Sequence, residues 1–220
     1  MSDVRLAVFD CDGTLSDGQA GVVHAMEAAF SAADLSPPDP HHVRRIVGLS
    51  LPQAVRHLSP DATSEQQAEA VDAYKAAFRR SREDGSLREP LFEGVADLLR
   101  RLNSAGWTLG VATGKSHRGL EATLAANDLT ALFATLHTAD AHPSKPHPAM
   151  LEAAMAETFA TPEATFMIGD TVYDIEMAAN AGVRAIGVAW GYHEPDELLG
   201  AGAMAVARDV GELERLLDDA

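Results

Sequence analysis

Short apolar runs recur along the chain and end at turn-forming or polar residues. They cover residues 5–9, 108–112, 165–168 and 184–188, and a weaker run lies at 134–137. Apolar runs of this length, bounded by turn signals, are typical of strands buried on both faces of a sheet. The pattern therefore predicts four strands, and the weaker run predicts a fifth.

A different periodicity fills the intervals between these runs. In residues 94–105 the apolar side chains recur three or four positions apart, the spacing of one face of a helix. Similar patterns cover residues 117–127, 148–159 and 172–181. Strands that alternate with helices predict an α/β fold with a parallel sheet, in which ligands bind at the C-terminal ends of the strands.

The segment that follows the first strand breaks this alternation. It carries helical patterns only, at residues 22–33, 41–47, 52–58 and 64–82. Ser64 and Gln67 have the spacing of a capping box, which predicts a helix start at that point. We therefore predict a small α-helical domain at residues 17–86, inserted into a core domain formed by residues 1–16 and 87–220.

The composition limits the possible partners. With 17 basic and 33 acidic residues, the 220-residue chain has a net charge of −16 and should repel nucleic acid and anionic membranes. No apolar run approaches the roughly 20 residues that span a bilayer, and the N-terminus has no signal-peptide pattern. Its single cysteine, Cys11, suits a reducing compartment. We expect a cytoplasmic monomer or homodimer that attracts an anionic substrate only locally.

Carboxylates follow two of the predicted strands. Asp10 and Asp12 come after the strand predicted at residues 5–9, and Asp170 and Asp174 come after the strand predicted at residues 165–168. Taken singly, Asp12 reads as part of a turn and Asp170 as a helix cap. If the strand ends meet, however, like charges about 4 Å apart repel by about 4 kcal/mol at an effective dielectric near 20. Such a cluster requires a cation, and oxygen ligands favour Mg²⁺.

Two further features lie near strand and helix ends. Thr113 and Gly114 follow the second strand just before a helix, where a hydroxyl and free N–H groups suit a phosphate. The tripeptide that begins at Gly114 is not a nucleotide-binding loop, because Leu109 stands where that motif requires glycine. Lys145 lies between prolines just ahead of another helix, and on its own it reads as a solvated lysine.

Together these features resemble the motifs of the haloacid dehalogenase (HAD) superfamily across nearly the whole chain. Residues 10–14 look like its first motif, Thr113 its second, Lys145 its third, and Asp170 with Asp174 its fourth. The resemblance implies a Rossmann-like parallel-sheet core with an α-helical cap of the C1 type inserted after the first strand. Phosphoglycolate phosphatases carry their cap in that position.

The resemblance also implies roles for the carboxylates. Asp10 would attack phosphorus to form an aspartyl-phosphate, and Asp12 would protonate the leaving alkoxide and then deprotonate a water. Magnesium would be held by Asp10, the backbone carbonyl of Asp12, and Asp170. Asp174 would act on the metal through water.

Phosphate binding and substrate choice fall to other residues by the same resemblance. Thr113, the Gly114 N–H and Lys145 would bind the phosphoryl oxygens. Arg44, Arg45 and Gly48 stand where cap residues face the active site in relatives, and either arginine suits a substrate carboxylate. The alternative for each arginine is a solvated helix face. The one cap lysine, Lys75, also reads as solvated.

Three functions remain open at this point. The first is a magnesium-dependent phosphatase for small phosphorylated metabolites, with phosphoglycolate as the best single guess. The second is a phosphosugar mutase of the β-phosphoglucomutase type, which shares every motif and differs in its cap contacts. The third is a non-catalytic, receiver-like binding protein with a phosphorylatable aspartate, against which the complete motif set and the cap both count.

Overall fold

The structure, a computed structural model, describes residues 4–219. Six parallel strands form one sheet in the order β3-β2-β1-β4-β5-β6. Their bounds are β1 (Leu6–Phe9), β2 (Thr108–Thr113), β3 (Phe133–Thr138), β4 (Thr165–Gly169), β5 (Arg184–Val188) and β6 (Ala205–Ala207). The predicted α/β class with a helical insert after the first strand is confirmed. The pattern missed β6, because three residues are too few to show a periodicity.

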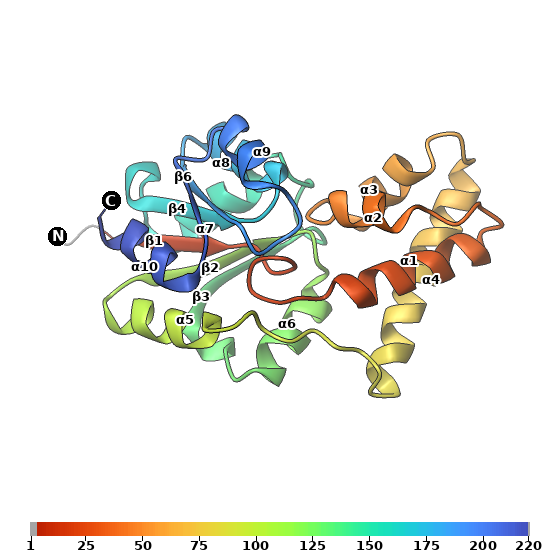
Figure 1. Cartoon of the computed structure of the whole chain (residues 1–220), viewed down its shortest axis with the longest axis horizontal. Helices are drawn as coiled ribbons and strands as arrows, with labels where there is room; N and C mark the ends of the chain where they lie inside the picture. Colours follow the sequence, from red (N-terminus) through yellow and green to blue (C-terminus); the bar gives the residue numbers. More distant parts are fainter. Residues whose placement is uncertain (1–3, 220) are drawn as a thin grey trace.

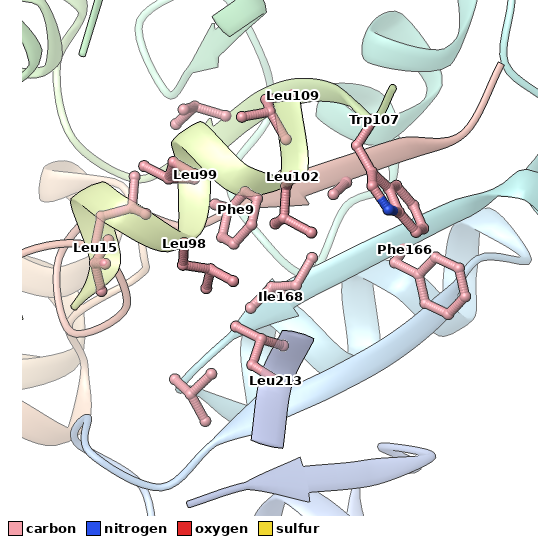
Figure 2. Packing of buried hydrophobic residues seen from close by; sticks show 14 of the residues in the cluster. Phe9, Leu15, Leu98, Leu99, Leu102, Trp107, Leu109, Phe166, Ile168 and Leu213 are labelled. Carbon is pink, nitrogen blue, oxygen red and sulfur yellow. The ribbon is translucent and has the colours of Figure 1, made fainter. Parts of the chain in front are cut away.

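Helices cover both faces of the sheet. One face packs against α5 (Val95–Ser104), α6 (His117–Ala126) and α10 (Val210–Asp218), and the other against α7 (Ala149–Thr158), α8 (Val172–Ala181) and α9 (Pro195–Gly200). Two short 3₁₀ turns, η1 (Thr130–Leu132) and η2 (Pro162–Ala164), precede β3 and β4. Within β1, Phe9 enters the first core and Val8 the second, as the alternation of a strand requires. Figure 2 shows Phe9, Leu98, Leu102, Ile168 and Leu213 packed together in the first core.

The insert between β1 and α5 is wholly helical. It comprises α1 (Gln19–Ala32), α2 (Pro40–Arg45), α3 (Leu51–Leu58) and α4 (Ser64–Glu83). These four helices gather at one end of the molecule's long axis (Figure 1). They share a hydrophobic cluster around Phe30, Val43 and Val55 that contains no residue of the sheet domain. This separate core is the reason to keep residues 17–86 as the proposed cap domain.

The start of α4 differs from the sequence expectation by one residue. The capping box is formed by Thr63 and Gln66, and Ser64 is already the first helical residue. The sequence offers hydroxyl and glutamine pairs in both registers, Thr63 with Gln66 and Ser64 with Gln67, so spacing alone could not choose between them. Gln67 instead donates to the carbonyl of Ser59. Among residues 4–219, no helix is both long enough and apolar enough to cross a membrane.

Candidate functional site

The candidate site lies where three adjacent strands end. β1 is flanked by β2 and β4, so Asp10 directly after β1 meets Thr113 at the end of β2 and Asp170 directly after β4. All three side chains are buried. The sheet order therefore brings together residues that lie about a hundred and sixty positions apart in the sequence, as the position of the strand ends predicted.

Three aspartates form a buried carboxylate cluster. One carboxylate oxygen from each of Asp10, Asp170 and Asp174 lies within 4.8 Å of the other two, and each side chain is fully buried. Asp10 Oδ1 is ion-paired with Lys145, and Asp10 Oδ2 has no hydrogen-bond partner within residues 4–219. A buried carboxylate with one unpartnered oxygen, in an all-oxygen cluster, fits a hard divalent cation such as Mg²⁺. No second group of this kind occurs in the part of the chain that the structure describes.

Lys145 is the cation that the structure places in this cluster. Its ammonium Nζ lies 2.9 Å from Asp10 Oδ1 and 2.5 Å from Asp174 Oδ1, and the whole side chain is buried. Burial would lower the pKa of Lys145, but Asp10 and Asp174 outweigh burial and raise it, so the ammonium stays charged. One ammonium against three carboxylates leaves an excess of negative charge, which a metal ion would offset.

The excess charge shows in the acidity of the carboxyls. Burial, together with the charge of Asp174, raises the pKa of Asp10 to about 6 despite the opposing effect of Lys145. Burial and the charges of Asp10 and Asp174 raise the pKa of Asp170 well above its ordinary value. Burial is the main cause of both shifts, because it disfavours the charged form, and the neighbouring carboxylates add to it. A divalent cation would supply compensating positive charge.

Asp170 is held rigidly at the strand end. Thr14 Oγ1 donates to Asp170 Oδ1 at 2.8 Å, and the N–H of Tyr192 donates to Asp170 Oδ2 at 2.9 Å. Gly13 has a φ of +93°, and a Cβ there would lie 2.2 Å from Asp170 Oδ2. The Gly-Thr pair of the first motif therefore has a local reason: the glycine admits the Asp170 carboxylate, and the threonine orients it.

Asp174 combines two tasks. Its Oδ2 accepts from the N–H and the hydroxyl of Thr171 at 3.1 and 2.7 Å and so caps α8, while its Oδ1 contacts Lys145. The sequence suggested Asp170 as the helix cap at this strand end, whereas Thr171 and Asp174 form the cap of α8. Capping holds the carboxylate so that it fixes the lysine beside Asp10.

Asp12 has a partner that sequence reasoning did not identify. Lys115 Nζ lies 2.8 Å from Asp12 Oδ1 and 2.5 Å from Glu89 Oε1. Burial would lower the pKa of Lys115, but Asp12, Cys11 and Glu89 together raise it. The only signal in the sequence was the position of Lys115 directly after Thr113 and Gly114, in a tripeptide that does not match the nucleotide-binding loop.

Glu89 anchors this ion pair on the connection between the insert and the core. It lies between α4 and α5, and its other carboxylate oxygen accepts from Thr123 Oγ1 at 3.3 Å and faces Arg82 at 3.5 Å. Arg82 belongs to the last turn of α4. A chain of charged contacts thus runs from the insert through Glu89 and Lys115 to Asp12.

A cavity of ≈ 830 Å³ opens above these strand ends, between the core and the insert. Asp10, Asp12 and Thr113 form part of its core wall, and Gly48 belongs to its insert wall. The approach of the two parts is close. A Cβ added to Gly114 would lie 2.5 Å from the carbonyl oxygens of both Gly48 and Leu49.

The two arginines suggested for substrate binding have other surroundings. Neither Arg44 nor Arg45 is among the residues that line the large cavity. Both terminal nitrogens of Arg45 donate to Glu197 on α9 at 2.7 Å, and the Nε of Arg44 is buried without a hydrogen-bond partner in the part of the chain that the structure describes. Arg45 therefore links the insert to the core in this structure.

Two more hydrogen bonds hold the insert against the core. The N–H of Ser50 donates to Ser144 Oγ at 2.7 Å, and His193 Nε2 donates to the carbonyl of Arg45 at 2.9 Å. The other ring nitrogen of His193 accepts from the N–H of Val172 at 3.2 Å, which fixes the tautomer. With the Arg45–Glu197 pair, these bonds keep the insert closed over the carboxylates.

Comparisons with known proteins identify related chains. A model of the family described as haloacid dehalogenase-like hydrolase matches residues 7–188. The chain is 39% identical to the probable phosphatase IndB of Dickeya dadantii, over 94% of this chain and 91% of that protein. It is 30% identical to the tyrosine-protein kinase PtkA of Mycobacterium tuberculosis, over 87% of this chain and 64% of that protein.

Two further matches extend over almost the entire chain. The phosphoglycolate phosphatase of Vibrio parahaemolyticus is 26% identical, over 96% of this chain and 95% of that protein. The crystal structure of a predicted phosphatase from Clostridium acetobutylicum is 25% identical, covers 100% of both chains and has a TM-score of 0.88. The helical insert is thus part of what the chain shares with these relatives.

Proposed function

Because the chain belongs to the haloacid dehalogenase-like hydrolase family, we propose that it is a magnesium-dependent phosphatase that hydrolyses small phosphomonoesters through an aspartyl-phosphate. The observation that carries this proposal is Asp10: a buried carboxylate in the wall of the cavity, with Oδ1 paired to Lys145 and Oδ2 without a hydrogen-bond partner within residues 4–219. A nucleophile needs a free oxygen, and a phosphate dianion needs a cation beside that oxygen.

The reaction would proceed in two displacements at phosphorus. In the first, an oxygen of Asp10 bonds to phosphorus, the bond to the ester oxygen breaks, and Asp12 gives its proton to the departing alkoxide. In the second, Asp12 takes a proton from a water, the water oxygen bonds to phosphorus, and the bond to Asp10 breaks to release phosphate. Lys115 and Glu89 hold Asp12 in place for both proton transfers.

The phosphoryl group needs positive charge that the chain as a whole lacks. We assign its oxygens to Thr113, the Gly114 N–H and the Lys145 ammonium. Asp10, the backbone carbonyl of Asp12, and Asp170 would hold the Mg²⁺, which when bound would offset the repulsion between the Asp10 carboxylate and the phosphate. Asp174 would support both cations by fixing Lys145 and lying beside the metal ligands.

Three cations at the cavity would draw the dianion in. Lys75 and Arg79 on α4 and Arg118 on α6 are exposed and line the cavity, in a chain whose net charge is −16. Local positive charge of this kind raises the concentration of an anion at the mouth of a cleft. Phosphoglycolate is the first substrate to test, because the sequence resemblance pointed to it and a relative that matches nearly the whole chain is a phosphoglycolate phosphatase.

The test is phosphate release by the Asp10→Asn variant. The wild type with Mg²⁺ should release inorganic phosphate from phosphomonoesters without a bisphosphate activator, which a mutase would require. Asp10→Asn should fold with an unchanged melting temperature and release none. Asp97→Asn, an exposed aspartate on α5 that removes the same charge, is the matched control and should keep full activity. Turnover by Asp10→Asn would reject the mechanism.

A further inference from the structure

The size of the cavity is the first clue to the substrate. At ≈ 830 Å³ it lies in the upper part of the range of about 300–1,000 Å³ that is usual for drug-sized ligands. Glycolate is a leaving group of a few heavy atoms and would leave most of this volume to water. A phosphatase gains specificity from contacts with the leaving group, and a leaving group that fills little of the cavity makes few contacts with the insert.

The insert walls of the cavity are the second clue, because they are mainly apolar. Val47, Leu49, Leu51, Tyr74 and Phe78 all line it, and each is only partly buried. They form the side of the insert's own core that faces the cavity. Partly buried apolar side chains around a cavity favour an apolar ligand body.

Two of these side chains form an aromatic pair. The rings of Tyr74 and Phe78 are one helical turn apart on α4, with centroids 5.0 Å apart and planes tilted by 34°. Such a pair offers a ring-shaped contact surface, which a further aromatic ring fits in an offset or edge-to-face arrangement. The groups proposed to act on the phosphate lie on the core side, around Asp10 and Thr113, and the insert wall also carries charged side chains of α4, among them Lys75 and Arg79.

We propose that the preferred substrates are phosphomonoesters whose leaving alcohol carries a bulky, mainly apolar body with an aromatic ring, which packs against Tyr74 and Phe78. This inference rests on the proposed phosphatase function and adds the chemical class of the leaving group to it. The phosphate sits at the strand ends beside Asp10, and the ring lies under the insert. Glycolate makes neither of the apolar contacts and has little surface to bury.

The experiment compares esters of alcohols with similar acidity. The specificity constant kcat/KM with Mg²⁺ is measured for naphthylethyl phosphate, ethyl phosphate and phosphoglycolate. Naphthylethyl phosphate should exceed ethyl phosphate by about tenfold or more, since a hydrophobic pocket gains roughly that from even one additional apolar group. Equal constants, or a preference for phosphoglycolate, overturn the inference while leaving the phosphatase proposal standing.

A binding measurement separates the inference from the proposed function. Naphthylpropyl phosphonate and propyl phosphonate, which have no ester bond to cleave, are titrated calorimetrically into the protein with Mg²⁺. Tighter binding of the naphthyl compound supports the inference even if no ester is hydrolysed, an outcome that would reject the phosphatase. Equal affinities for both phosphonates overturn the inference.

Variants of Phe78 test whether the apolar body of the substrate packs against this side chain. Since Lys115 Nζ lies 6.0 Å from the centre of the Phe78 ring, a change there also reaches the partner of Asp12, and the readout is therefore the ratio of the two constants. Phe78→Ala should reduce the naphthylethyl-to-ethyl ratio about tenfold, and Phe78→Leu should reduce it less. Phe159→Ala, at an 88% exposed position at the end of α7, is the control and should leave the ratio unchanged. An unchanged ratio in Phe78→Ala refutes the placement.

Discussion

Replacing Gly114 by alanine tests whether the insert must close onto the strand ends for catalysis. A Cβ at position 114 would lie 2.5 Å from the carbonyl oxygens of Gly48 and Leu49, and both obstacles are backbone atoms that no rotamer change can move. Ordinary van der Waals contact begins near 3.4 Å. The loop at residues 48–49 must therefore retreat by about 0.9 Å, the difference between these distances.

A displacement of this size is large for catalysis and small for folding. Misplacing catalytic or positioning groups by about 1 Å can cost about a hundredfold in rate, so kcat/KM should fall by roughly 10- to 100-fold. The insert can move outward as a unit with its own core intact. The free energy of unfolding should therefore change by less than about 1 kcal/mol, within the range of ordinary glycine-to-alanine changes.

The assay pairs phosphate-release kinetics with thermal unfolding of the same preparations. Gly200→Ala is the matched control, because a Cβ at that position at the end of α9 meets no atom within 4 Å. It should behave like the wild type in both measurements. Wild-type kcat/KM in Gly114→Ala would refute the reasoning, since the closed arrangement would then be dispensable. A large fall in melting temperature would refute it too, because the strain would not have been relieved by opening.

Two further predictions concern charge. Mg²⁺ should raise the melting temperature of the wild type, because it relieves the repulsion among the buried aspartates. Asp170→Asn should abolish this rise in melting temperature, and the control Asp97→Asn should retain it. An equal rise in Asp170→Asn would show that the aspartate cluster does not bind the metal. Arg45 and the N–H of Glu194 lower the pKa of Glu197 to about 2, below the ordinary 4.5. The Arg45–Glu197 ion pair therefore stabilises the fold fully above about pH 4.5, and this stabilisation is lost as the pH falls toward 2. Urea unfolding should show Glu197→Gln less stable than the wild type by under about 1 kcal/mol at neutral pH and equally stable near pH 2; a difference that does not change with pH would contradict the assignment.

The position of the carboxylates was predictable because strand ends in a parallel sheet share one edge. Apolar runs located the strands, and Asp10, Asp170 and Thr113 each stand directly at the end of one. No knowledge of loop shape was needed to place them together. Lys145 was harder, because it follows no strand directly and reads alone as solvated; only the complete set of motifs singled it out.

Residues whose surroundings come from distant segments were not predictable. Lys115 contacts Asp12 and Glu89 because the connection after α4 passes beside the end of β2, and no spacing in the sequence records that approach. Arg44 and Arg45 look alike in the sequence. Only the position of α9 separates them, since it presents Glu197 to Arg45.

The sequence by itself indicated a chemistry for Asp10: a carboxylate at the end of a buried strand, with further aspartates after another strand and a lysine in a connecting segment. It could do so because local patterns of apolar residues record where each strand lies and where it ends, although they do not record the order of the strands in the sheet. Only the tertiary structure decided what lies opposite Asp10, namely a cavity of ≈ 830 Å³ walled by Tyr74, Phe78 and other apolar side chains. The closure of the insert creates that space. The size of the cavity depends on how the insert packs against the core domain. The apolar periodicity within each part predicts its own helices and strands and does not predict this packing.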